Sequence, residues 1–65
     1  MNNKQRAAAR RVLNQYPNLR PQEIGNTLTI IDVTDETSRT SLDVSPSLDA
    51  RQLERDLIVA CGALS

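Results

Sequence analysis

Residues 27–34 read TLTIIDVT, and six of these eight residues are branched at Cβ. Such a composition favours a β-strand, and Leu28 and Ile30 alternate as a half-buried strand requires. The alternation then shifts, because Ile31 and Val33 point to the opposite face. The segment predicts a strand that is covered on both faces or that carries a bulge near Ile30 and Ile31. A helix is the alternative, since Ile24, Leu28 and Ile31 are spaced i, i+4, i+7, although the glycine, asparagine and threonines among them disfavour it.

The residues that follow predict a second strand, paired with the first in a hairpin. Residues 35–38 (DETS) have the composition of a turn. In residues 39–45, Thr40, Leu42 and Val44 lie on one face and polar residues on the other. The segment ends before Pro46, which is typical of an edge strand. Another subunit can add to an exposed edge, so the hairpin predicts an association site.

The chain before this hairpin predicts a helix. Its apolar face consists of Ala9, Val12, Leu13 and Tyr16, which follow the i, i+3, i+4, i+7 spacing. Asn2 or Asn3 can cap its start, because an asparagine side chain accepts from free backbone amides. Pro17 ends it, because proline disfavours helical geometry in the residue before it.

The connector between this helix and the hairpin predicts one further turn of helix. Pro21 suits a first helical position, and Gly25 suits a helix stop. Leu19 and Ile24 would then fix the connector against the first helix.

The chain after the hairpin predicts a second long helix. Its apolar stripe contains Leu53, Leu57, Ala60, Cys61 and Leu64. It can begin at residues 45–46 (Ser-Pro), or at Asp49 in a capping box with Gln52. Ile58 and Val59 widen the stripe beyond what one neighbouring element would cover, which predicts a second contact surface.

The whole chain, residues 1–65, predicts one small α+β domain: helix, short helical turn, β-hairpin, helix. Its core is thin, because there are 16 leucine, isoleucine and valine residues and one aromatic residue, Tyr16. A domain of this size buries only about 60% of its unfolded surface. A single cysteine, Cys61, cannot form an internal disulfide, and the absence of histidine disfavours a zinc site. Dimerisation is therefore expected to complete the fold.

Targeting and membrane segments are not expected. Residues 1–11 are polar and basic rather than signal-like. The most apolar stretch, residues 57–64, is far shorter than the roughly 20 residues that cross a bilayer. The unpaired cysteine favours a reducing compartment, so we expect a cytoplasmic protein.

Catalytic chemistry is not predicted, and no cofactor, metal or small-molecule substrate is expected. Histidine is absent, and the single lysine lies near the N-terminus. Acidic pairs, Asp35 with Glu36 or Asp32 with Asp43, could hold a metal, but such residues are more often turn residues. Cys61 lies on an apolar stripe with no cationic neighbour in the sequence, which favours a buried hydrophobic role over a reactive thiol.

Charge divides unevenly along the chain. Residues 1–22 contain five basic residues and no acid, whereas residues 23–65 contain eight acids and three arginines. Such asymmetry indicates a nucleic-acid contact or the docking of the basic half on an acidic half. The candidate nucleic-acid-binding residues are Lys4, Arg6, Arg10, Arg11 and Asn14, of which Arg6, Arg10 and Asn14 recur at i, i+4, i+8 and could reach phosphates or base edges.

Together these patterns predict a non-enzymatic regulatory or adaptor protein that binds protein and associates with itself. Its expected interface combines the hairpin edge with the apolar face formed by Leu57, Ile58, Val59, Cys61 and Leu64. The alternative is a small dimeric transcriptional regulator that presents the basic first helix to duplex DNA. RNA is the less expected nucleic acid, because the chain lacks the aromatic residues on which bases stack.

Overall fold

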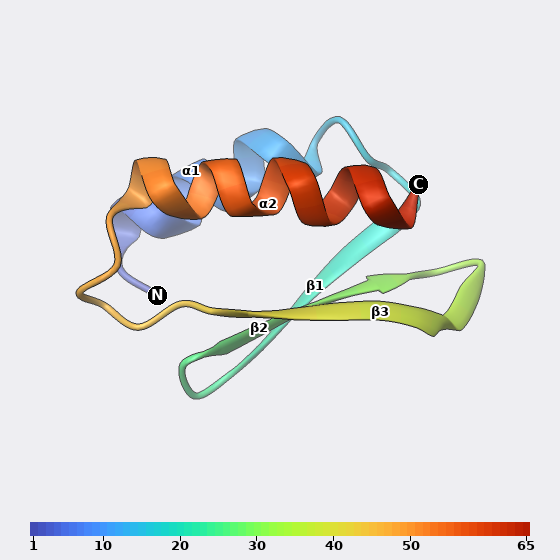
Figure 1. Cartoon of the computed structure of the whole chain (residues 1–65), viewed down its shortest axis with the longest axis horizontal. Helices are drawn as coiled ribbons and strands as arrows, with labels where there is room; N and C mark the ends of the chain where they lie inside the picture. Colours follow the sequence, from blue (N-terminus) through green and yellow to red (C-terminus); the bar gives the residue numbers. More distant parts are fainter.

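The computed structural model describes all of residues 1–65, as two helices and a three-stranded antiparallel sheet (Figure 1). The elements in chain order are α1 (Asn3–Leu13), β1 (Leu19–Ile24), β2 (Thr27–Asp32), β3 (Asp35–Asp43) and α2 (Ala50–Leu64). The predicted α+β class is confirmed, and so are the two helices and the hairpin formed by β2 and β3. The turn of this hairpin lies at residues 33–34, however, and residues 35–38, which were predicted as the turn, begin β3.

Helix α1 begins with a complete capping box. The Asn2 side chain accepts from the Gln5 amide at 2.9 Å, and the Gln5 side chain accepts from the Asn2 amide at 2.9 Å. Two of the amides that a helix start leaves free are thereby satisfied. The helix ends at Leu13, earlier than predicted, and Tyr16 follows it while still packing against the core.

The predicted turn of helix in the connector is wrong, because residues 19–24 form strand β1. This strand pairs with β2 in antiparallel register from Leu19 opposite Asp32 to Ile24 opposite Thr27. Gly25 turns the chain with a φ of 59°, a conformation that glycine adopts without a steric cost. Gly25 is thus the first residue of a two-residue hairpin turn rather than a helix stop. Leu19 is buried as expected, but Ile24 is 67% exposed and does not pack against the core, so the predicted fixing of the connector by both residues is wrong for Ile24.

Strand β2 is the centre of the sheet, because β1 pairs with it as well. Strand β3 is an edge, as the sequence predicted. Leu28 and Ile30 are fully buried on the face toward the helices, whereas Thr29 and Ile31 lie on the open face. The pairing with β3 becomes irregular between Ile31 and Asp32. A register irregularity therefore lies next to the predicted bulge position, and the helical alternative for this segment is wrong.

Helix α2 begins at Asp49, whose side chain accepts from the Arg51 amide at 3.4 Å. The predicted capping box does not form, because the Gln52 amide donates instead to Asp56 at 3.0 Å, one turn further along the helix. Asp49 therefore caps the helix alone.

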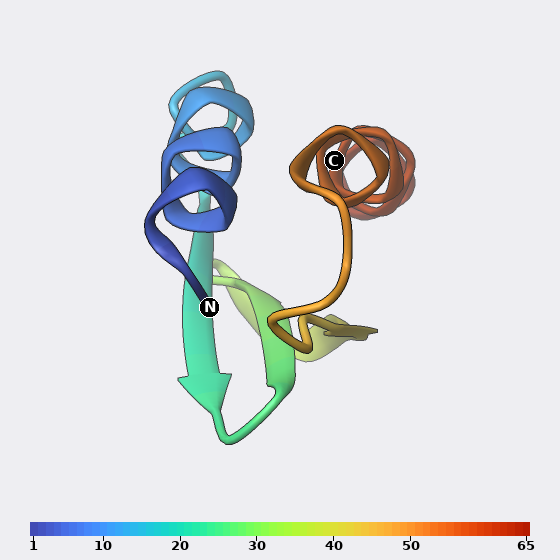
Figure 2. The ribbon, with the colours of Figure 1, turned by 90° about the vertical axis from the view of Figure 1, so that its left-hand side faces the viewer.

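Both helices cover the same face of the sheet, α1 on the β1 side and α2 on the β3 side (Figure 2). Both also run in the same direction (Figure 1). The core lies between the two layers and consists of Ala9, Val12, Leu19, Leu28, Ile30, Val44, Leu53, Leu57 and Cys61. Neither helix has the length and apolarity needed to cross a membrane.

Candidate interaction surfaces

The apolar face of α2 is divided between the core and solvent. Leu57 and Cys61 are fully buried within the chain and Leu64 is half-buried, whereas Ile58 is 53% exposed and Val59 is 73% exposed. A partner could therefore reach only Ile58, Val59 and part of Leu64 among the five predicted interface residues. Sequence periodicity placed all five on one broad face and did not separate the residues that the sheet covers.

Ile58 and Val59 lie on different sides of α2. Ile58 borders a shallow groove of about 240 Å³ between the two helices, together with Val12, Tyr16 and Glu54. Val59 follows Ile58 by 100° around the helix and does not line this groove. The two exposed side chains therefore belong to two surfaces.

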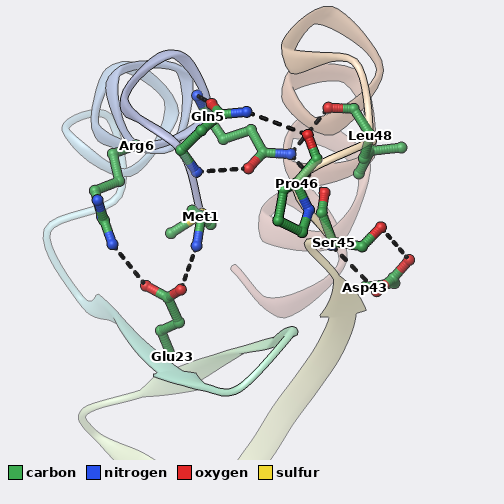
Figure 3. Close-up of polar contacts among 9 residues, drawn as sticks. Met1, Gln5, Arg6, Glu23, Asp43, Ser45, Pro46 and Leu48 are labelled. Carbon is green, nitrogen blue, oxygen red and sulfur yellow. Dashed lines mark hydrogen bonds and ion pairs between the residues drawn. The ribbon is translucent and has the colours of Figure 1, made fainter.

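The basic residues of α1 are likewise distributed over two flanks. Arg11 lies 3.3 Å from Glu54 of α2, whereas Arg6 lies 3.9 Å from Glu23 of β1 (Figure 3). At 100° per residue, Lys4 falls on the flank of Arg11 and Arg10 on the flank of Arg6. The five predicted nucleic-acid-binding residues are all exposed, but they do not form a single face.

The flank of Arg6 borders a groove between α1 and β1 of about 400 Å³. Arg6, Arg10 and Asn14 line it from the helix, and Pro21 and Glu23 line it from the strand. Glu23 accepts a hydrogen bond from the Met1 ammonium, and this bond together with the charge of Arg6 lowers the pKa of Glu23 (Figure 3). A carboxylate thus lies among the cations of this groove and partly neutralises them.

Two of the acidic residues considered as metal ligands, Asp32 and Asp35, accept hydrogen bonds from residues close to them in the chain. The hydroxyl and amide of Thr34 donate to Asp32 at 2.7 and 2.9 Å, and these bonds lower the pKa of Asp32. The Thr37 hydroxyl donates to Asp35 at 2.6 Å, and this bond lowers the pKa of Asp35. Asp32 is the last residue of β2, whereas Asp43 of β3 lies opposite Thr27, the first residue of β2. The two carboxylates therefore lie at opposite ends of the hairpin. No group of three potential metal ligands occurs in the structure.

Cys61 lies within the core, and burial raises the pKa of its thiol. The reactive form of a cysteine is the thiolate, which a raised pKa disfavours. This geometry fits the buried hydrophobic role that the sequence favoured.

The two edges of the sheet differ in the backbone groups that they present. The amide of Val33 donates to the carbonyl of Asn18 at 2.9 Å. In an antiparallel ladder every second residue of a strand bonds the neighbouring strand, and Asn18 is one of these residues. The backbone groups of Leu19, Pro21 and Glu23 therefore point away from β2. The Leu19 amide donates to Tyr16 at 3.0 Å, and proline has no amide. Only Glu23 therefore has a free outward amide, so the β1 edge is poorly suited to strand addition.

The β3 edge is open by the same reasoning. The Val44 amide donates to the carbonyl of Asn26 at 2.8 Å, which fixes the phase of the β2–β3 ladder. Arg39, Ser41 and Asp43 then direct their backbone groups away from β2, and all three residues are exposed. The strand contains no proline. The sequence predicted an edge strand here, but the direction of each amide depends on the register, which only the structure gives.

Comparisons with protein-family models, with curated proteins and with solved structures found no match.

Proposed function

We propose that this chain is a non-enzymatic regulatory or adaptor protein that acts by binding protein, including a second copy of itself, through the open edge of β3. The observation that carries the proposal is the difference between the two sheet edges. A strand whose outward amides and carbonyls are unpaired is a template for pairing with another chain. At β1, a proline and an internal hydrogen bond remove most of these donors, whereas β3 retains them.

The flank of α2 beside this edge supports the proposal. Helix α2 lies on the β3 side of the molecule (Figure 2), and its Val59 is 73% exposed, so a partner that covered this side chain would add apolar burial to the hydrogen bonds of strand addition. Asp32 accepts hydrogen bonds from Thr34, and the Cys61 thiol is buried in the core. The buried unpaired thiol also favours a reducing compartment such as the cytoplasm.

A substitution that removes one outward backbone amide of β3 tests this proposal. We expect Ser41→Pro to weaken self-association, because proline removes an outward donor while leaving the β2 ladder intact. Sedimentation analysis over a micromolar concentration range measures the association, and circular dichroism checks the fold. The matched control is Ser41→Ala, which also loses the hydroxyl contact with Thr29 at 3.1 Å but keeps the amide.

Three results are informative. Equal association of the two Ser41 variants would exclude the β3 edge as the contact. If Ile58→Glu weakened association and Ser41→Pro did not, the contact would be the groove between the helices. A parent protein that stays monomeric at every concentration would contradict self-association altogether.

Duplex DNA binding is the competing candidate, and the exposed Arg6, Arg10 and Asn14 on one flank of α1 favour it. Each phosphate neutralised adds about 0.9 to the slope of log affinity against log salt. A double alanine variant of Arg6 and Arg10 should therefore flatten that slope by up to about 2 in a gel-shift titration. The matched control is the same change at Lys4 and Arg11, on the other flank. Absence of any shift at low salt and micromolar protein would exclude this candidate.

A further inference from the structure

The free part of the β3 edge is short and symmetric about Ser41. Its outward backbone groups belong to Arg39, Ser41 and Asp43. At one end, the Thr37 amide donates to Asp35 at 3.2 Å, and at the other the Ser45 amide donates to Asp43 at 3.3 Å. The amides of Thr37 and Ser45, on either side of this stretch, are therefore satisfied within the chain. The outward amides of Arg39, Ser41 and Asp43 remain available.

Opposite charges stand at the two ends of this free stretch. Arg39 and Asp43 lie on the open face of the sheet, opposite the uncharged Ile31 and Thr27 of β2. Neither has an ion-pair partner in the chain. The Arg39 guanidinium donates to the Glu36 carbonyl at 2.7 and 3.0 Å and reaches no carboxylate. A cation and an anion on one edge strand, equally distant from Ser41, are thus both left without a counter-charge.

We propose that a second copy of this chain adds to β3 in an antiparallel register centred on Ser41, with Arg39 of each copy opposite Asp43 of the other. This inference rests on the proposed function, because it specifies the partner and the register at the same edge. Ser41 would lie opposite Ser41 of the partner subunit, and both chains would exchange backbone hydrogen bonds at the three free positions. The result is a continuous sheet and a closed, two-fold symmetric dimer.

Other antiparallel registers satisfy these residues less well. Because the outward groups alternate, the register can shift only in steps of two residues. A shift by two places Arg39 opposite a serine and leaves Asp43 without a directly opposite cation. In the centred register, directly opposite residues have Cα atoms about 5.5 Å apart, within reach of an arginine–carboxylate pair.

The same symmetry covers the exposed flank of α2. A two-fold axis that continues the sheet keeps the helices of both copies on one face. Because α2 lies on the β3 side of the molecule (Figure 2), the two α2 helices would become neighbours across the axis. Val59 is the most exposed large apolar side chain, at 73%, and a neighbouring α2 helix would bury part of it. The centred register therefore places apolar area as well as charge at the interface.

Charge reversal tests the register. We expect Arg39→Glu and Asp43→Arg each to weaken self-association by roughly tenfold to a hundredfold, because each places two like-charged pairs across the dimer. An equimolar mixture of the two variants should recover association to within a few-fold of the parent, because only the mixed dimer has two attractive pairs. The double variant, which exchanges the two charges, should recover in the same way. Sedimentation measures all four samples, and circular dichroism confirms that each is folded.

The outcomes distinguish this register from the proposed function. If the single variants associate like the parent, or if the mixture does not recover, the register is wrong while self-association stands. If the parent itself never associates, both proposals fail together.

Cross-linking gives a second, independent measurement. In a centred dimer a residue on the axis meets its own copy, so Ser41→Cys should form an intermolecular disulfide under mild oxidation. Thr29→Cys is the matched control, because Thr29 lies beside Ser41 on the same face but one strand further from the edge. Cys61 is buried in both variants. Equal cross-linking of the two variants, or none at Ser41→Cys in a protein that dimerises, would overturn the register.

Discussion

Gln5 is the one fully buried polar residue, and it links α1 to the segment that joins β3 and α2. Its side chain is fully buried, and its amide nitrogen donates to the carbonyls of Ser45 at 2.8 Å and Leu48 at 2.9 Å (Figure 3). Its oxygen accepts from Asn2 at 2.9 Å. A single side chain thus caps α1 and holds the segment that joins β3 to α2. No buried side-chain polar atom in the protein lacks a partner.

Replacement of Gln5 by leucine should destabilise the protein. The substitution leaves two carbonyls of the β3–α2 segment and the Asn2 amide without their partner, and buried unpaired groups cost about 1–3 kcal/mol each. We expect a loss of about 2–4 kcal/mol in the free energy of unfolding, measured by urea titration. Gln15→Leu, at an exposed position after the same helix, should change stability by less than about 0.5 kcal/mol. Equal effects of the two substitutions would contradict this role for Gln5.

At the scale of elements, β1 shows where local sequence signals are ambiguous. Pro21 and Gly25 predicted the start and stop of a short helix, and the same residues suit an edge strand and a hairpin turn. The strand forms because residues 19–24 find a complete antiparallel partner in β2. Pairing with the next strand along the chain, which follows after only two residues, outweighs a weak local preference for a helical turn.

The helices were predictable in type, whereas their ends and exposure were less so. Their apolar spacing is strong, and Asn2 caps α1 as the sequence allowed. At α2, Gln52 turns to Asp56 instead of completing a capping box. Which residues of an apolar stripe remain exposed depends on the width of the neighbouring layer. Ile58 and Val59 extend beyond it, and Leu57 does not.

At the scale of the whole molecule, the basic residues of segment 1–22 meet acidic residues of segment 23–65 at a few exposed contacts. Arg6 approaches Glu23 and Arg11 approaches Glu54. Exposed pairs of this kind contribute about 0.2–1 kcal/mol each and are screened by salt. They do not account for the fold, which rests on the core between helices and sheet.

Salt should therefore act differently on association and on folding. We expect the self-association constant to fall as sodium chloride rises from 50 mM to 1 M, because the Debye length shortens to about 3 Å and screens the proposed pairs between Arg39 and Asp43. The free energy of unfolding of the monomer should change by less than about 1 kcal/mol. Sedimentation and urea titration at both salt concentrations measure these quantities. Association that tightens with salt would point to apolar burial as the main contact, since excluded salts strengthen it.

The sequence by itself determined the α+β class, the two amphipathic helices, the β2–β3 hairpin and the edge position of β3. These features follow from local periodicity and turn composition, which residues impose on their own neighbourhood. Only the tertiary structure decided that residues 19–24 form a third strand, that Leu57 and Cys61 are buried while Val59 is exposed, and that the outward amides of β3 are those of Arg39, Ser41 and Asp43. Burial depends on which segment packs opposite, and amide direction depends on the strand register, since a shift of one residue would exchange the inward and outward positions of β3.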